Sequence, residues 1–286
     1  MKKIAIMTDT NSGILPYEAE KNGIFMLQMP FIVDGEEFFD YGSMEYSEFF
    51  ARMGAGATVS TSQPSPAALC EMWERILKSY ESVIYLPMSS GLSGTCATAK
   101  AFSAEYEGRV FVVDNKRISV TLNAAVYDAL YLRDKGFTAA EVTEKLESNA
   151  LSASIYITVN TLEYLKKSGR VTSAGAAIGS LLGIKPVLQI QGEKLDAFKK
   201  VRGIAAAKET MLEAVKVDLE TRFYGKKLRL STAFSGSRTQ GEEWCNAASE
   251  YFPDYEIELD ALPVSISCHL GPGALGIGIC EVEKAD

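Results

Sequence analysis

The residues best placed for chemistry are a serine at the entrance to a predicted helix and the single histidine of the chain. Ser93 lies in Gly91-Leu92-Ser93-Gly94-Thr95, after a predicted strand and before a predicted helix, as the serine of a nucleophile elbow does. The match is incomplete, because Thr95 stands where that motif has its second glycine. Any Ser-His pair must use His269. One hypothesis is therefore a serine hydrolase in which His269 activates Ser93.

The same segment has a second, non-catalytic interpretation. The first turn of a helix carries backbone N–H groups without partners, and these groups bind anions. Ser93, Gly94 and Thr95 would then hold a carboxylate or a phosphate, whether or not Ser93 is a nucleophile. An ordinary serine-rich helix cap is the third alternative.

A second hydroxyl-rich stretch, residues 58–66, also runs into a predicted helix. It reads Thr-Val-Ser-Thr-Ser-Gln-Pro-Ser-Pro and contains Thr61 and Ser62. Two such stretches in one half of the chain could converge on one oxygen-bearing ligand. Simple capping of the following helix is the alternative.

Two basic clusters stand out in this acidic chain. Arg170 follows Lys166 and Lys167, and Arg202 follows Lys199 and Lys200. Such clusters could meet an acidic partner or a phosphate group, although a solvated surface is the more common explanation.

Nucleotide and metal chemistry find little support in the sequence. Gly271-Pro-Gly273-Ala-Leu-Gly276 fits G-x-G-x-x-G by letters, but only ten residues follow it and they are predicted to form a strand rather than the required helix and strand. We interpret this segment as a turn whose glycines adopt positive φ. A phosphate-binding loop with Gly-Lys-Ser/Thr is absent, and a single histidine without paired cysteines is a poor ligand set. We therefore predict no cofactor and no metal.

Composition places the chain among ordinary globular proteins. It has 286 residues, of which 47% are hydrophobic and 23% charged, and its 29 basic and 37 acidic residues give a net charge of −8. That charge argues against nucleic acid as a partner. The five cysteines lack C-x-x-C spacing, and the sequence shows neither a secretory signal nor a long apolar segment suited to lipid. We therefore predict a cytoplasmic protein without stable membrane insertion.

The order of predicted elements indicates two α/β domains, residues 1–150 and 151–286. In the first, strands are expected at 3–7, 82–87 and 109–113 and helices at 66–80, 94–106, 119–135 and 138–148, which favours a mainly parallel sheet. In the second, strands are expected at 155–159, 185–191, 228–234, 255–262 and 274–283 and helices at 161–168, 172–182, 203–224 and 237–251. The surplus of strands there favours a mixed sheet flanked by helices.

Taken together, these segments resemble the DegV family of bacterial proteins. The matching pieces occur in the family's order over nearly the whole chain. They are Thr8-Asp9-Thr10, Thr61-Ser62-Gln63-Pro64-Ser65, Ser89-Ser90-Gly91-Leu92-Ser93-Gly94-Thr95, Gly169-Arg170-Val171, Lys185-Pro186 and His269-Leu-Gly271-Pro272-Gly273-Ala-Leu-Gly276. Two segments depart from the family pattern: Asn11-Ser12-Gly13-Ile14 is less regular, and the stretch after Arg202 is less basic.

The resemblance implies a long-chain fatty acid bound in a tunnel between the two domains. It further implies a non-enzymatic subunit that presents the ligand carboxylate to a separate ATP-dependent fatty acid kinase, which forms an acyl phosphate. By that analogy, Thr61 and Ser93 hold the carboxylate, with Ser62, Gly94, Thr95 and His269 close by. Arg170 and Arg202 are candidates for the phosphoryl-transfer or docking surface. The serine hydrolase, and a regulatory binder whose partner affinity depends on acyl occupancy, remain as alternatives.

Overall fold

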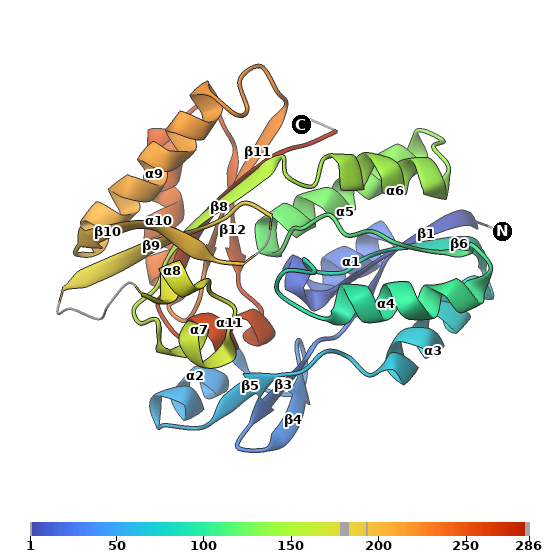
Figure 1. Cartoon of the computed structure of the whole chain (residues 1–286), viewed down its shortest axis with the longest axis horizontal. Helices are drawn as coiled ribbons and strands as arrows, with labels where there is room; N and C mark the ends of the chain where they lie inside the picture. Colours follow the sequence, from blue (N-terminus) through green and yellow to red (C-terminus); the bar gives the residue numbers. More distant parts are fainter. Residues whose placement is uncertain (1, 178–182, 193, 284–286) are drawn as a thin grey trace.

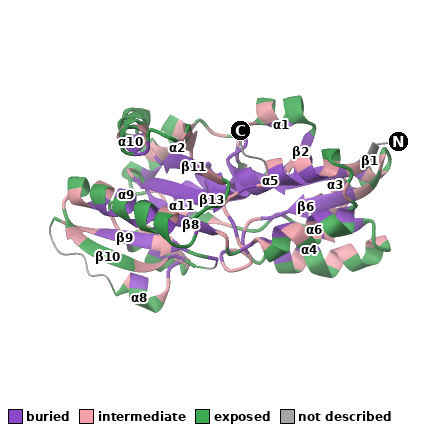
Figure 2. Cartoon of the chain, turned by 90° about the horizontal axis from the view of Figure 1, so that it is seen from above, coloured by how far each residue is buried: buried purple, intermediate pink, exposed green. Residues whose placement is uncertain are grey.

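The chain builds three β-sheets that meet around a common centre (Figure 1). The computed structural model describes residues 2–177, 183–192 and 194–283. Buried residues concentrate on the central strands, while the outer faces of the helices are exposed (Figure 2). Among the described residues, no helix combines the length and the apolar character that crossing a membrane would require.

The first sheet is wholly parallel and has the order β2-β1-β6-β7, which confirms the predicted parallel sheet. Its strands alternate along the chain with helices that cover both faces, as parallel βαβ units require. The elements are β1 (Lys2–Asp9), α1 (Pro16–Asn22), β2 (Ile24–Leu27), α3 (Pro66–Leu77), β6 (Tyr80–Leu86), α4 (Thr95–Ser103), η2 (Ala104–Tyr106), β7 (Val110–Val112), α5 (Ser119–Asp134) and α6 (Ala139–Ser148).

Alternation along β1 and β6 explains how this sheet buries both faces. Met7 and Tyr85 pack with Trp73 of α3, whereas Ile6 and Ile84 pack in a second cluster with α5 and α6. Because neighbouring side chains of a strand point to opposite faces, the near-continuous apolar run in each strand serves two helix layers at once.

The second sheet is mixed, as predicted, and has the order β10-β9-β8-β13-β11-β12. β11 and β12 pair in parallel, and the other neighbouring strands pair antiparallel. One face packs on α9 and α10, and the other faces the first half of the chain. The elements are β8 (Ala153–Thr158), β9 (Ile184–Ile190), β10 (Asp196–Arg202), α9 (Ile204–Glu220), β11 (Leu228–Phe234), α10 (Arg238–Tyr251), β12 (Ile257–Ala261) and β13 (Leu275–Glu281).

A third sheet, absent from the sequence-based prediction, links the two halves. It is antiparallel with the order β4-β3-β5 and packs, together with α2, against helix α11 near the end of the chain. Phe31 and Phe49 lie edge to face 5.8 Å apart within this contact, which also buries Val264 and Cys268. The elements are β3 (Pro30–Val33), β4 (Glu36–Phe39), α2 (Tyr46–Gly54), β5 (Val59–Thr61) and α11 (Val264–Leu270).

Most predicted elements are present, with shifted ends. The helix predicted at 66–80 ends at Leu77, because Tyr80 already pairs with β1 as the first residue of β6. The helix predicted at 161–168 is α7 (Glu163–Ser168), and of the one predicted at 172–182 the structure describes α8 (Ser173–Ala176), with 178–182 outside the described residues. The proposed domain boundary at residue 150 falls between α6 and β8, where the chain passes from the first sheet to the second.

Candidate functional site

A cavity of about 290 Å³ lies where the three sheets meet. In the first sheet β1 connects outward to β2 on one side while β6 connects to β7 on the other, so the strand order reverses between β1 and β6. Ligands of open parallel sheets bind in the crevice beyond the strand ends at such a point. The cavity follows this rule, since Asn11 comes just after β1 and Met88 just after β6, and both line it.

The walls of the cavity are predominantly apolar. The second sheet supplies its floor, helices α7 and α11 and the start of α5 close its sides, and the first sheet contributes the residues that follow β6. The apolar lining side chains are Met29, Pro30, Met88, Leu92, Ile118, Val120, Ile155, Ile157, Leu165, Ile190, Leu195, Ala233, Leu262, Ile266, Leu270 and Ile277. The volume is at the lower end of the range of about 300–1,000 Å³ usual for small-molecule sites.

Two glycines of β13 shape the floor. Gly276 and Gly278 both line the cavity. A Cβ atom on Gly278 would lie 2.5 Å from Val120 Cγ2, whereas one on Gly276 would meet nothing closer than 3.5 Å. The close approach of α5 to β13 therefore requires a glycine at 278. The other two glycines of the G-x-G-x-x-G match, Gly271 and Gly273, have φ of 70° and 81°, which confirms the predicted turn at these two positions, whereas Gly276 belongs to β13 and does not have positive φ.

A threonine and the single histidine meet at the polar part of the cavity. Thr61 is the last residue of β5, where it pairs with Phe31 of β3, and His269 lies on α11. Thr61 Oγ1 is 2.9 Å from His269 Nε2. Both side chains line the cavity, so the third sheet and α11 together place this pair.

His269 is neutral at physiological pH. Burial, and to a smaller extent the positive charge of Arg170, together lower the pKa of its imidazole to about 4. Its Nδ1 is buried without a hydrogen-bond partner among the described residues. When a neutral ring donates its Nε2–H to Thr61 Oγ1, the threonine hydroxyl keeps its own proton free for an acceptor in the cavity.

Ser93 lines the cavity at the entrance to α4. Its Oγ is 2.9 Å from Thr95 Oγ1 and accepts a hydrogen bond of 3.2 Å from the backbone N–H of Thr95. Thr95 itself is buried and does not line the cavity. The described residues contain no hydrogen bond between Ser93 and His269: Ser93 Oγ contacts Thr95, and Nε2 of His269 contacts Thr61 Oγ1. The arrangement thus gives no support to a Ser-His catalytic pair.

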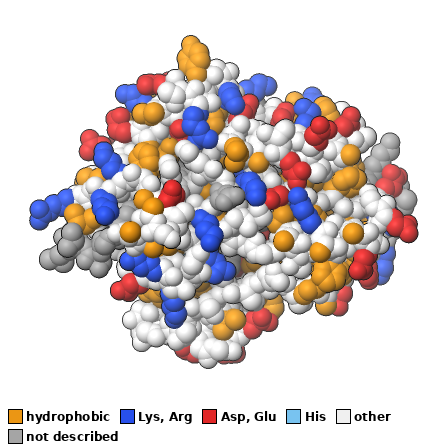
Figure 3. All heavy atoms as spheres, in the orientation of Figure 1, with side chains coloured by type: hydrophobic (Ala, Val, Ile, Leu, Met, Phe, Trp, Pro, Cys, Tyr) orange, Lys and Arg blue, Asp and Glu red, His pale blue; other side chains and the backbone are white. Residues whose placement is uncertain are grey.

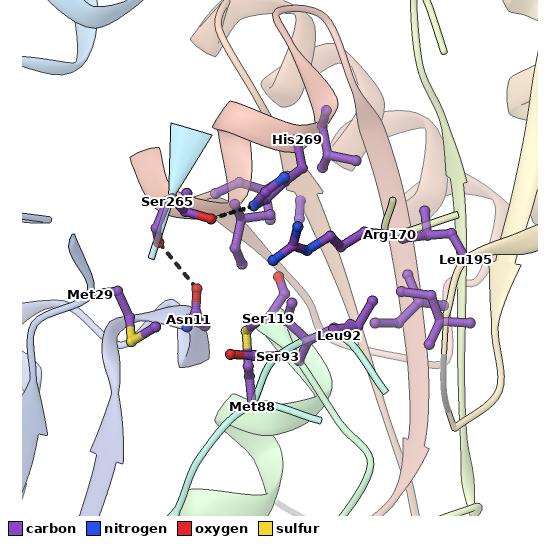
Figure 4. Close-up of a pocket in the computed structure, with 18 of the residues that line it drawn as sticks. Asn11, Met29, Met88, Leu92, Ser93, Ser119, Arg170, Leu195, Ser265 and His269 are labelled. Carbon is purple, nitrogen blue, oxygen red and sulfur yellow. Dashed lines mark hydrogen bonds between the residues drawn. The ribbon is translucent and has the colours of Figure 1, made fainter. Parts of the chain in front are cut away.

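The structure separates the two arginines singled out in the sequence. Arg170 lines the cavity, and its guanidinium group lies between His269 and Ser93 in Figure 4. Arg202, at the end of β10, is exposed and outside the cavity. Ser62 and Gly94 are exposed and also line the cavity, so they lie at its rim. Figure 3 shows further Lys and Arg side chains on the face that carries α7, β9 and β10.

A buried polar network behind the cavity was missed by the sequence analysis. Asp40 accepts hydrogen bonds from Thr10 Oγ1 at 2.7 Å, from the Ser265 hydroxyl at 2.6 Å and from the Ser265 backbone N–H at 3.0 Å. Burial raises the pKa of the Asp40 carboxyl, and these hydrogen bonds oppose that rise. Ser265 and Asn11 line the cavity. The Thr8-Asp9-Thr10 segment was the one available signal, but Asp40 directly follows β4 of a third sheet that was not predicted.

Two other depressions are more than twice as large as this cavity but differ from it chemically. One of about 900 Å³ lies beside α5 and β11 and includes Arg133, Asp134, Glu256 and Glu258. Another of about 750 Å³ lies between α9 and β10. Most of the residues that line each of them are polar or charged, unlike those of the first cavity. Within the described ranges, no group of three or more His, Cys, Asp or Glu side chains is arranged to hold a metal ion.

Comparison with known proteins agrees with this architecture. The family model described as "Uncharacterised protein, DegV family" matches residues 3–282. A DegV domain-containing protein of Deinococcus radiodurans is 29% identical over 278 residues, which cover 96% of this chain and 98% of that protein.

Two solved structures are similar along almost the whole chain. One, from Thermus thermophilus, is described as "Fatty Acid Binding of a DegV family Protein"; it is 28% identical, with a TM-score of 0.88 and coverage of 98% of this chain and 100% of that one. The other, described as "DegV, a fatty acid binding protein from Bacillus subtilis", is 26% identical, with a TM-score of 0.86 and the same coverage.

Proposed function

Because the chain belongs to the DegV family, we propose that it binds a long-chain fatty acid in the cavity between its sheets. The observation that carries the proposal is a continuous apolar lining that ends at the Thr61–His269 pair, Ser93 and Arg170. An apolar tail and an acidic head match these two parts of the cavity. The fatty-acid-binding relatives of similar fold support the same ligand class.

Burial of the tail supplies the driving force. An acyl chain of about sixteen carbons gains roughly 0.8 kcal/mol for each buried CH₂, or about 12 kcal/mol before costs. Association and ordering remove a large part of that gain, so a cavity already present in the folded protein is an advantage.

The head group needs compensation for leaving water. An ionised carboxylate enters a partly buried site only when hydrogen bonds or opposite charges replace its hydration. The hydroxyls of Thr61 and Ser93 supply two donors, and the guanidinium of Arg170 supplies positive charge. The neutral ring of His269 orients the Thr61 hydroxyl through the 2.9 Å contact at Nε2. Ser62 and Gly94 complete this end of the proposed site, and Thr95, which does not line the cavity, positions Ser93 through the 2.9 Å contact between their hydroxyls.

We further propose that the protein presents this carboxylate to a partner ATP-dependent kinase that makes an acyl phosphate. Exposed residues at the rim, Ser62 and Gly94, put the polar end of the cavity within reach of another molecule. The sequence has no phosphate-binding loop of its own, so the phosphoryl group would come from the partner. Arg202, together with Lys199 and Lys200, offers a positive docking surface, and Arg170 lies at the site of transfer. In this proposal the chain has no catalytic step.

Two experiments separate this proposal from its alternatives. Mass spectrometry of protein purified from bacteria should detect a co-purified fatty acid, and added palmitate should bind; finding neither would refute it. A fluorophosphonate probe should leave Ser93 unlabelled, whereas labelling would favour the hydrolase. Pull-downs with and without fatty acid would reveal a regulatory binder if the captured partners change without acyl phosphate being formed.

A further inference from the structure

Asp40 is a buried carboxyl group to which the proposed binding of a ligand assigns no role. The residue is 1% exposed, and none of the ion pairs in the described part of the chain involves it. A buried carboxyl group without a cation beside it is costly unless hydrogen bonds replace its hydration. Its oxygens accept from Thr10 Oγ1, from Ser265 Oγ and from the backbone N–H of Ser265. A fully paired polar group of this kind fixes the positions of the elements that it joins.

The carboxyl group of Asp40 caps helix α11 from a distant part of the chain. The first backbone N–H groups of a helix have no partner within it, and Pro263, the residue before α11, supplies no side-chain cap. Asp40, which precedes Ser265 by 225 positions, accepts from the N–H of Ser265 at 3.0 Å, and the backbone of Val264 also donates to its carboxyl. A carboxylate at this end of a helix is further favoured by the helix dipole. Asp40 therefore takes the place of the missing local cap.

The first and third sheets fix the position of Asp40 itself. Its backbone N–H donates to the carbonyl of Met29 at 3.2 Å, and its own carbonyl accepts from Gln28 Nε2 at 2.9 Å. Thr10, which donates to its carboxyl at 2.7 Å, opens the short helical turn η1 (Thr10–Ser12) after β1. The next residue, Tyr41, has φ of 60°, a left-handed conformation that residues with a side chain rarely adopt and that surrounding contacts must hold. Asp40 thus joins β1, β4 and α11.

Helix α11 transmits this position to the proposed head-group site. It has seven residues, about two turns, with Ser265 in the first turn and His269 in the last (Figure 4). A shift of the helix at Ser265 therefore moves His269 relative to Thr61. Their contact of 2.9 Å remains a hydrogen bond only within a few tenths of an ångström. The apolar packing of α11 on the third sheet is not directional, so it does not set this distance by itself.

We propose that Asp40 is the positioning residue of the head-group site, because its carboxyl holds α11 where His269 meets Thr61. The inference rests on the proposed fatty-acid binding, and Asp40 itself does not line the cavity. Two substitutions grade its contribution. Alanine removes every acceptor, whereas asparagine keeps an oxygen for the N–H of Ser265 and presents an NH₂ group to the hydroxyls of Thr10 and Ser265.

Two measurements on the full chain test the assignment: NMR titration of the single histidine and calorimetry with palmitate. In Asp40→Ala, the His269 midpoint should rise from about 4 towards 6.5, because a ring released from Thr61 is less buried. The same variant should bind palmitate about tenfold more weakly. Asp40→Asn should change both quantities in the same direction by less, since one acceptor is kept.

Asp218→Asn is the matched control. Asp218 is also a buried aspartate, accepts from Tyr156 Oη at 2.9 Å, lies on α9 and does not line the cavity. This variant should keep the wild-type midpoint and the wild-type affinity. A wild-type value of either quantity in Asp40→Ala would overturn the proposal. Failure of the unmodified chain to bind palmitate would instead contradict the fatty-acid function, and the His269 midpoint would still decide whether Asp40 positions α11.

A pair of milder variants keeps the proposal testable if the Asp40 variants do not fold. Thr10 does not line the cavity, and Thr10→Val removes one donor to Asp40 whereas Thr10→Ser retains the hydroxyl. Thr10→Val should raise the His269 midpoint and weaken palmitate binding, and Thr10→Ser should do neither. Identical midpoints in these two variants would overturn the role of Asp40 as a positioning residue.

Discussion

Thr61 and His269 are separated by 208 positions in the sequence, yet Thr61 Oγ1 lies 2.9 Å from His269 Nε2. The contact joins the last residue of β5 to α11, and thus the third sheet to the end of the chain. Which of the two groups donates depends on the tautomer of the imidazole ring. A neutral histidine that donates to the threonine oxygen turns the threonine hydroxyl into a donor for a ligand.

Replacing Ser93 tests the proposed carboxylate contact. Ser93→Ala should weaken palmitate binding by about 1–3 kcal/mol, because one carboxylate oxygen loses its donor in a partly buried site. Ser90→Ala serves as the control, since Ser90 belongs to the same loop, pairs with Lys116 and does not line the cavity. Isothermal titration calorimetry gives both affinities. Equal binding by the Ser93 variant and the control would place the carboxylate elsewhere.

The single histidine allows its protonation to be measured directly. A tag-free protein should show one imidazole titration by NMR, with a midpoint near the pKa of about 4 caused by burial and by Arg170. The folded pKa is below the unfolded value of about 6.5, so the unfolded chain takes up this proton first and the His269 contribution to stability is lost as the pH falls from about 6.5 to 4.

Two perturbations of this titration have a defined sign. Bound palmitate should raise the midpoint, because a carboxylate near the ring favours its charged form. Arg170→Ala should also raise it, though by less than full exposure would, since burial is the larger cause of the shift. A midpoint near 6.5 in the unliganded protein would show that His269 is not buried as described here.

The two arginines should separate ligand binding from phosphoryl transfer. Arg170→Ala should weaken palmitate binding, because Arg170 supplies positive charge in the cavity. Arg202→Ala should leave that affinity unchanged and reduce acyl phosphate formation in an assay with a fatty acid kinase subunit, because Arg202 lies outside the cavity. Loss of ligand binding in the Arg202 variant would argue against its assignment to the docking surface.

Substitution of the two cavity glycines of β13, Gly276 and Gly278, tests how closely α5 packs on this strand. Gly278→Ala should lower the free energy of unfolding by about 1–3 kcal/mol, since its new methyl group would lie 2.5 Å from Val120 Cγ2 and force α5 away from β13. Gly276→Ala should cost less, because its nearest neighbour is at 3.5 Å. Urea denaturation measures both. A larger loss in the Gly276 variant would contradict the described contact between α5 and β13.

Much of the fold was predictable where the hydrophobic residues repeat with the spacing of a helix or of a strand. The strand predicted at 228–234 coincides with β11, and the helices α5 and α6 each differ from the prediction by one residue at one end only. The third sheet was missed because its strands have only three or four residues, too few to establish an alternating pattern. Helix α11 was missed because it lies in an uncharged stretch with two prolines and four glycines.

The candidate site was predictable only in part, because it depends on contacts between segments far apart in the sequence. Thr61, Ser93 and His269 were selected by residue type and by family resemblance, and the structure brings all three to one cavity. Asn11 and Ser265 were not selected, because their importance depends on Asp40 and on the packing of the third sheet against α11. Long-range contacts of this kind have no local signature in the sequence.

A crystal structure of the protein with palmitate tests the central claim most directly. We predict electron density for the acyl chain along Ile155, Ile157 and Gly278, with the carboxylate within hydrogen-bond distance of both Thr61 Oγ1 and Ser93 Oγ. Density for the head group away from these two hydroxyls, or a cavity that stays empty at saturating palmitate, would contradict the account.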